Sequence, residues 1–185
     1  MTIPALLLAS LLSAVLVFLV SSIVHMATPR HAGDFQKVPD EDGVMAALRP
    51  FKLAPGVYAM PRPANMKDMG SEAFKAKARL GPIAMIHVSP SGQTGMGKQL
   101  GLWFLYSIVV ALMAGYVASR GLSVGAPFMG VLEFVGTVAF IGYSAGLWQE
   151  AIWYNRSWAV TLKSTIDGAI YGALTGLAFA WLWPR

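Results

Sequence analysis

Residues 3–24 read IPALLLASLLSAVLVFLVSSIV, an apolar run without a charged side chain. A helix rises about 1.5 Å per residue, so a run of this length spans a bilayer core of about 30 Å. A cleaved secretory signal has Lys or Arg before its apolar run, a shorter run than this one and a small-x-small exit. None of these three features is found here. The run therefore predicts an uncleaved transmembrane helix over residues 1–24.

Three further apolar runs lie in the second half of the chain, at about residues 100–118, 128–148 and 158–183. Ser119-Arg120-Gly121 closes the first of them, and Pro127 opens the next. The last run carries Lys163 and Asp167 in its early turns, so its helix must begin before Asp167 with Lys163 reaching back to the interface. These runs predict a three-helix transmembrane bundle over residues 99–185.

Composition agrees with a membrane protein, because the chain is 56% hydrophobic and only 12% charged. Of its charged residues, 16 lie between Met26 and Lys98, which leaves the apolar runs nearly free of charge. The absence of cysteine excludes disulfides, thiolate catalysis and cysteine-bound zinc or iron–sulfur clusters. We expect an all-α membrane protein with four transmembrane helices and a small cap.

The cap is the polar, membrane-associated segment 25–98. Pro39 and the acidic residues 40–42 open a short helix that reaches Leu48, and Ser71-Glu72 begins another that Gly81-Pro82 ends. Residues 56–60 and 83–88 read as strands. Since two strands alone are marginally stable, we expect this α+β cap to pack on the helices, on another subunit or on lipid.

Tryptophan and basic residues predict the orientation. Trp103, Trp148, Trp153 and Trp158 would lie at one membrane interface, and Trp181 and Trp183 at the other. The side that carries residues 25–98 holds 12 of the 14 Lys and Arg residues. The positive-inside rule therefore places residues 25–98 in the cytoplasm and both termini outside.

Three patterns suggest ligand chemistry, and each has a simpler explanation. Residues 92–98 follow a strand and precede a helix as in a phosphate-binding loop, but Gln99 stands where a magnesium-binding Ser or Thr belongs. Of the histidines His25, His31 and His87, only His25 lies at the end of a predicted span, whereas a membrane haem needs two facing ligands. Seven methionines in residues 26–96 suit cuprous copper or adaptable packing. We expect no cofactor, metal, nucleotide or nucleic acid.

Glu133 and Asp167 are the two acids expected at membrane depth, where a carboxylate is a candidate functional group. Arg120 ends the neighbouring span on the side of Glu133, and Lys163 precedes Asp167 by one helical turn. Both acids are therefore expected to form shallow, partly solvated ion pairs, with proton or cation transport as the alternative.

Small residues at four-residue spacing are the strongest pattern in the sequence. In lipid, such faces let helix backbones approach closely. The packing faces are Ser164, Gly168, Gly172, Gly176 and Ala180 in the last helix, Gly142 and Gly146 in the third, and Ser107, Ala111 and Gly115 in the second. Ala178 lies in the last helix and is expected to point away from the Gly172–Gly176 face of that helix, toward lipid.

Five stretches of the sequence are distinctive: Ser-Ser-Ile-Val-His at 21–25, Pro-Asp-Glu-Asp at 39–42, Gly-Val-Tyr-Ala-Met-Pro at 56–61, Asp-Gly-Ala-Ile-Tyr-Gly at 167–172 and Trp-Leu-Trp-Pro at 181–184. They resemble a family of small bacterial integral membrane proteins with no established activity. The resemblance implies a bacterial inner-membrane location and assigns no catalytic residue.

The small-residue faces favour a non-catalytic accessory or scaffold subunit, with lipid and other membrane subunits or a second copy as partners. The alternative is a proton- or ion-coupled carrier that uses Glu133 and Asp167. A carrier needs a broken helix or a water-filled path, and the sequence indicates neither. An enzyme is not expected, because no catalytic constellation falls on one predicted surface.

Overall fold

The computed structural model describes residues 2–92 and 94–185, and it is mostly helical. Contacts divide the chain into two units: a helix bundle of residues 2–35 and 96–185, and an α+β unit of residues 36–95. The predicted turn at 92–98 includes Gln93, which lies outside the described residues.

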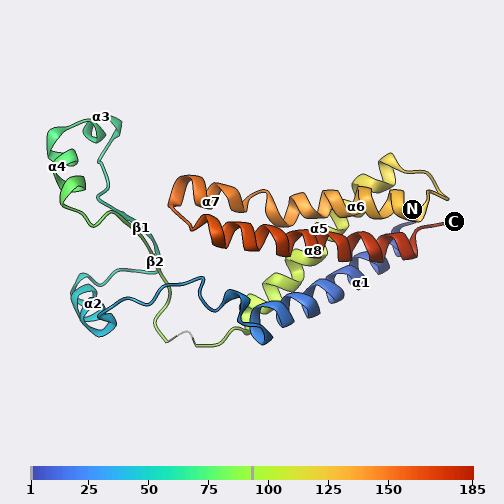
Figure 1. Cartoon of the computed structure of the whole chain (residues 1–185), viewed down its shortest axis with the longest axis horizontal. Coiled ribbons are helices and arrows are strands. Elements are labelled where there is room, and N and C mark those ends of the chain that lie inside the picture. Colours follow the sequence, from blue (N-terminus) through green and yellow to red (C-terminus); the bar gives the residue numbers. More distant parts are fainter. Residues whose placement is uncertain (1, 93) are drawn as a thin grey trace. The chain divides into compact units, whose positions relative to one another are not determined.

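Four long helical segments form the bundle (Figure 1). Helix α1 (Ile3–Ser22) continues into a π-helical turn, η1 (Ile23–Ala27). Helices α5 (Gly97–Gly121) and α8 (Trp158–Leu182) are continuous, and α6 (Phe128–Ser144) is followed closely by α7 (Leu147–Tyr154). All four segments are long and apolar enough to cross a membrane, which confirms this part of the predicted fold.

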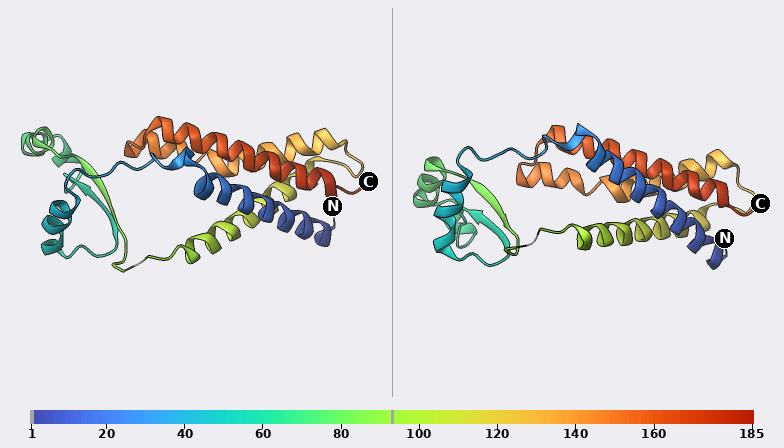
Figure 2. Two further views of the ribbon diagram at one scale, coloured as in Figure 1. Left: turned by 60° about the horizontal axis from the view of Figure 1, so that its bottom comes forward. Right: turned by 90° about the horizontal axis from the view of Figure 1, so that it is seen from below.

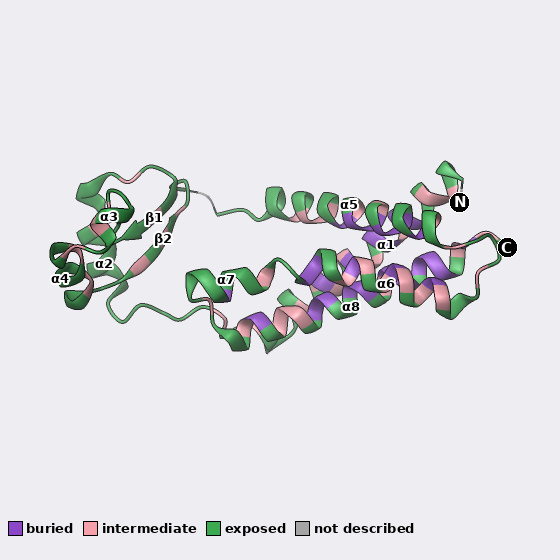
Figure 3. Cartoon of the chain, turned by 90° about the horizontal axis from the view of Figure 1, so that it is seen from above, coloured by how far each residue is buried: buried purple, intermediate pink, exposed green. Residues whose placement is uncertain are grey.

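The four long helices pack in a ring, in which α1 and α6 each contact both α5 and α8 (Figure 2). The end of α8 meets the α5–α6 connection, where the Trp183 indole donates to the Ser123 carbonyl at 3.0 Å. The buried residues gather where these helices face one another (Figure 3). Many of them are alanine or valine, and small side chains allow close helix packing.

The glycine face of α8 packs against α6 of the same chain. A Cβ added to Gly172 would lie 2.7 Å from the Gly136 carbonyl oxygen, and one added to Gly176 would lie 2.5 Å from the Leu132 carbonyl oxygen. A Cβ on Gly168 would overlap the Ser144 hydroxyl. The expectation for Ala178 was wrong: its side chain is 2% exposed, because α8 is covered on more than one face.

The other small residues occupy several environments. On α5, Ser107, Ala111 and Gly115 are buried, and Gly115 lies against Phe179 of α8. Gly142 contacts Val110 of α5, whereas Gly146 has open space where a side chain would be. On α8, Ala180 is buried and Ser164 is half-buried.

The third long segment is broken, where the sequence predicted one helix over 128–148. Helix α6 ends at Ser144, a turn follows at Ala145 and Gly146, and α7 extends to Tyr154. Glycine weakens a helix interior, and here no packed neighbour compensates for it. The Trp148 indole donates to the Thr165 hydroxyl at 3.1 Å, so α7 is tied to α8.

The α+β unit is built on a two-stranded antiparallel sheet of β1 (Gly56–Met60) and β2 (Ala84–Val88), with Tyr58 opposite Ile86. Its helices are α2 (Glu41–Leu48), α3 (Met66–Met69) and α4 (Glu72–Leu80). The Asp40 and Ser71 side chains cap α2 and α4 by accepting from backbone N–H groups.

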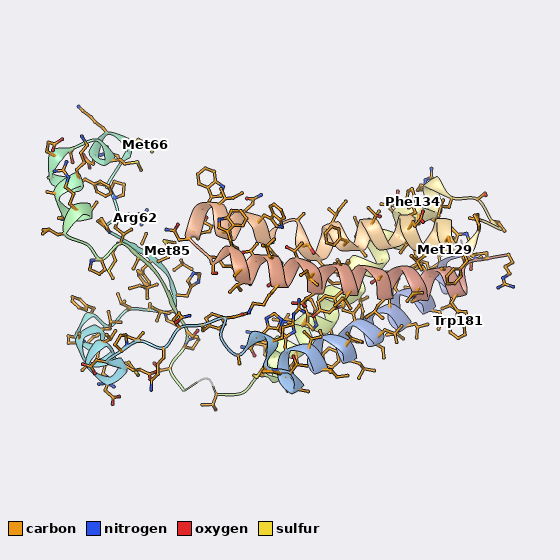
Figure 4. All side chains as sticks on the ribbon, in the orientation of Figure 1. Arg62, Met66, Met85, Met129, Phe134 and Trp181 are labelled. Atoms are coloured by element: carbon orange, nitrogen blue, oxygen red, sulfur yellow. The ribbon has the colours of Figure 1, made fainter. Side chains whose placement is uncertain are left out.

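No described residue of the α+β unit is buried. Apolar side chains stand exposed along it, including Phe51 at 70%, Leu80 at 86% and Ile83 at 70%. Met66 and Met85, which Figure 4 labels on this unit, are 81% and 40% exposed.

Candidate functional site

A buried carboxylate lies in the N-terminal half of α8, close to the segment that follows α1. The Asp167 side chain on α8 is 3% exposed. Its Oδ1 lies 3.3 Å from Nε of Arg30, and its Oδ2 lies 3.0 Å from Nε2 of His31. Both partners come from the segment that follows α1, so this carboxylate joins the first and last long helices.

His31 lies between two carboxylates, because its Nδ1 is 2.6 Å from Oδ2 of Asp34. The Lys163 ammonium donates to the other oxygen of Asp34 and, at 3.0 Å, to the Arg30 carbonyl. Hydrogen bonds from Lys163, and then from His31, hold the pKa of the Asp34 carboxyl below its ordinary value. Acidic and basic groups thus alternate from Lys163 through Asp34 and His31 to Asp167 and Arg30.

Local sequence explains how the chain returns His31 toward α1. The π-helical turn at Ile23–Ala27 contains His25, whose Nδ1 lies 3.0 Å from the Ser21 carbonyl. Thr28 leaves the helical conformation before Pro29, which opens the short 3₁₀ turn η2 (Pro29–His31). The two imidazole rings then stack with centroids 4.2 Å apart and planes 6° apart.

A cavity of about 360 Å³ adjoins this cluster. Its walls are mostly apolar, with Leu100 and Trp103 of α5 facing Leu147 of α7, and Asp167 and His25 line it as well. Trp103, Tyr143 and Tyr171 pack edge to face or tilted around it, with centroids 5.6 to 5.9 Å apart. The Trp103 indole donates to the Ser21 hydroxyl at 2.8 Å, so this tryptophan faces inward.

Two buried polar groups on the cavity wall, the Tyr171 hydroxyl and the Asp167 carboxylate, form no well-formed hydrogen bond within the part of the chain that the structure describes. The Tyr143 hydroxyl is shielded from solvent on the same wall, where the Ser107 and Thr175 side chains offer it hydrogen bonds. The contacts of Asp167 with Arg30 and His31 are close in distance but lack hydrogen-bond geometry. A buried polar group without a partner costs about 1–3 kcal/mol, so such groups at a cavity suit a bound molecule.

The expected ion pairs were wrong in their partners. Lys163 pairs with Asp34, and Asp167 is buried against Arg30 and His31 instead of being shallow and solvated. Glu133 is exposed on α6, and no ion pair joins it to Arg120 within residues 94–185.

Glu133 and Asp167 do not share a site. Gly176 packs at the level of Leu132, next to Glu133, whereas Gly168 packs at the level of Ser144. At 1.5 Å per residue the two carboxylates differ in height by roughly 15 Å. Glu133 lines shallow grooves on the outside of α6, and Asp167 lines the cavity.

The sequence reasoning missed the cluster because it judged each histidine alone. The signal was the short distance from His25 through Pro29 to His31, which allows one reversal of the chain and places both rings together. Comparison with models of known protein families, with characterised proteins and with solved structures gives no match.

Proposed function

We propose that the chain is a multi-pass membrane protein that binds a small, largely apolar molecule in the cavity between α1, α5, α6, α7 and α8. The observation that carries this proposal is a mostly apolar wall on which the buried Tyr171 hydroxyl has no hydrogen-bond partner within the described residues. On the same wall, the Asp167 carboxylate makes close ion-pair contacts but no well-formed hydrogen bond. Binding sites for small molecules commonly combine apolar walls with a few convergent polar groups. The ligand would therefore have an apolar body and at least one hydrogen-bonding group.

Two structural features support access to this cavity. The break between α6 and α7 places Leu147 on its wall, and the π-helical turn places His25 there. Interrupted helices and π-turns recur at binding sites within membrane proteins and elsewhere. A carrier role remains a proposal for Asp167 alone, since Glu133 does not reach the cavity.

The test is to purify the protein from its own membrane in mild detergent and identify bound small molecules by mass spectrometry. Leu100→Trp fills the cavity and should abolish recovery of the molecule. Leu102→Trp is the matched control on the same helix, because Leu102 is 55% exposed. Equal recovery from both variants would contradict the proposal.

A hydroxyl deletion provides a second readout. Tyr171→Phe removes a buried hydroxyl without a described partner, so the ligand-free protein should melt at the same or a higher temperature. The same change should weaken ligand retention. A lower melting temperature would mean that the hydroxyl already serves the fold.

A second proposal is an accessory subunit of a larger membrane complex, favoured by the exposed apolar surface of the α+β unit. The glycine face of α8 no longer favours it, because that face packs against α6. Leu80→Asp should then release a stoichiometric partner in pull-down experiments while the bundle stays folded. We also propose the orientation that the sequence predicts, with residues 25–98 in the cytoplasm of a bacterial cell.

A further inference from the structure

We propose that His25, His31 and Asp167 bind one divalent transition-metal ion beside the cavity. One donor atom from each of the three side chains lies within 4.8 Å of the other two. Metal–ligand bonds of about 2.0–2.2 Å bring donor atoms to roughly 3.5 Å from one another, so small side-chain rotations would close the site. The metal site goes beyond the proposed ligand binding and does not depend on it.

The histidines are already oriented as metal-binding histidines are. A metal-binding imidazole usually donates its other N–H to a carboxylate or a backbone carbonyl, which fixes the ring. His31 Nδ1 faces Asp34 at 2.6 Å, and His25 Nδ1 faces the Ser21 carbonyl at 3.0 Å. In both rings Nε2 is left as the nitrogen for the metal.

The remaining donor atoms lie close to one another and to Arg30, without a well-formed hydrogen bond. Within the described residues, His31 Nε2 and both Asp167 oxygens are buried and form no hydrogen bond of acceptable geometry. The His31 and Asp167 side chains are 10% and 3% exposed. A metal ion bound to His31 Nε2 and Asp167 Oδ2 would satisfy both groups at once.

The donor set indicates the kind of metal. Two imidazoles and one carboxylate suit zinc, iron, cobalt, nickel or copper, whereas magnesium and calcium prefer oxygen donors alone. Three protein ligands leave at least one coordination position free. Since His25 and Asp167 both line the cavity, that position would be open to a molecule inside it.

Nearby cations oppose a metal ion and provide a diagnostic variant. Arg30 Nε lies 3.3 Å from Asp167 Oδ1, and Lys163 neutralises Asp34. Arg30→Gln removes one competing positive charge and should strengthen metal binding. In an ion-pair network without a metal role, the same variant would only lower stability.

The experiment uses the full chain in detergent, freed of metal by chelation and titrated with Zn²⁺ and Co²⁺ by calorimetry and visible absorbance. We expect one equivalent of either ion to bind and a large excess of Mg²⁺ not to displace it. His25→Ala should weaken binding by more than the roughly 10–100-fold typical for loss of an outer partner, and Asp34→Asn by about that amount. His25 is exposed, so its variant should fold.

His87→Ala is the matched control, because His87 lies on β2 of the α+β unit. It should bind zinc as the wild type does. Equal zinc affinity of the wild type and His25→Ala, or an equal loss in His87→Ala, would overturn the proposal. The recovery of a bound small molecule from Leu100→Trp tests the cavity separately. The proposed cavity ligand and the proposed metal site can therefore fail independently.

Discussion

At the residue scale, the environment of the Asp167 side chain depends on partners that are distant in the sequence. Its carboxylate contacts Arg30 and His31 from the segment that follows α1, and its positive partner Arg30 is 36% exposed. Removing one member of a buried ion pair leaves the other charge uncompensated. The exposure of Arg30 reduces this penalty, because water can solvate the freed guanidinium.

Asp167→Asn should therefore destabilise the protein, although the side chain keeps its shape. Loss of a buried pair typically costs about 3–5 kcal/mol, and partial exposure of the partner lowers our estimate to about 1–3 kcal/mol. The measurement is the melting temperature in detergent containing a chelator, which removes any contribution from metal. Glu133→Gln, which changes an exposed acid on α6, is the control and should shift the melting temperature little. Similar shifts for both variants would show that burial of Asp167 does not matter to stability.

The cluster around Asp167 was only partly predictable. The sequence identified Asp167 and Lys163 as charges within an apolar run, since intramembrane charges are rare. It assigned them to each other because neighbouring turns of one helix were the only contacts that spacing could suggest. Lys163 instead binds Asp34, which is 129 positions away, and such a contact depends on how whole helices pack.

At the element scale, the contact between α6 and α8 rests on backbone atoms. The nearest neighbours of a Cβ at Gly172 would be the Gly136 carbonyl oxygen and the Phe140 backbone nitrogen and Cβ. Backbone atoms of a packed helix cannot turn aside as a flexible side chain can. A larger residue at this position must therefore separate the two helices.

Gly172→Leu should destabilise the bundle by at least the roughly 1–3 kcal/mol that overpacking costs in other cores. Ala173→Leu is the matched control, because Ala173 is the next residue on the same helix and is exposed. Thermal unfolding and gel filtration of the two variants give the comparison. If Gly172→Leu behaved like Ala173→Leu, the close approach of α6 and α8 would contribute nothing to stability.

The sequence predicted most elements because their signals are local. Ser71 and Asp40 cap helices where capping residues were expected, and the strand at 56–60 has the predicted bounds. The break after α6 was missed because Gly142 and Gly146 were read together as one packing face. Only Gly142 contacts a neighbouring helix, and Gly146 lies at the turn that interrupts the segment.

At the scale of the whole molecule, four consecutive crossings would place both ends of the bundle's chain on one side of a membrane. The contact of Trp183 with Ser123 already joins the end of α8 to the α5–α6 connection. Only 2 of the 14 Lys and Arg residues, Arg120 and Arg185, belong to that end. The charge difference favours export of this end and retention of residues 25–98 in the cytoplasm.

The chain contains no cysteine, so a single introduced thiol reports the side on which it lies. Val124→Cys marks the α5–α6 connection, where Val124 is 64% exposed, and Ser91→Cys marks the exposed end of the α+β unit. A maleimide that cannot cross membranes should label Val124→Cys in intact cells and Ser91→Cys only after the cells are opened. The reverse pattern would mean that the first helix inserts in the opposite direction despite the basic residues of segment 25–98. Labelling of both thiols in intact cells would contradict an odd number of crossings between the two positions, and with it the proposal that α5 spans the membrane.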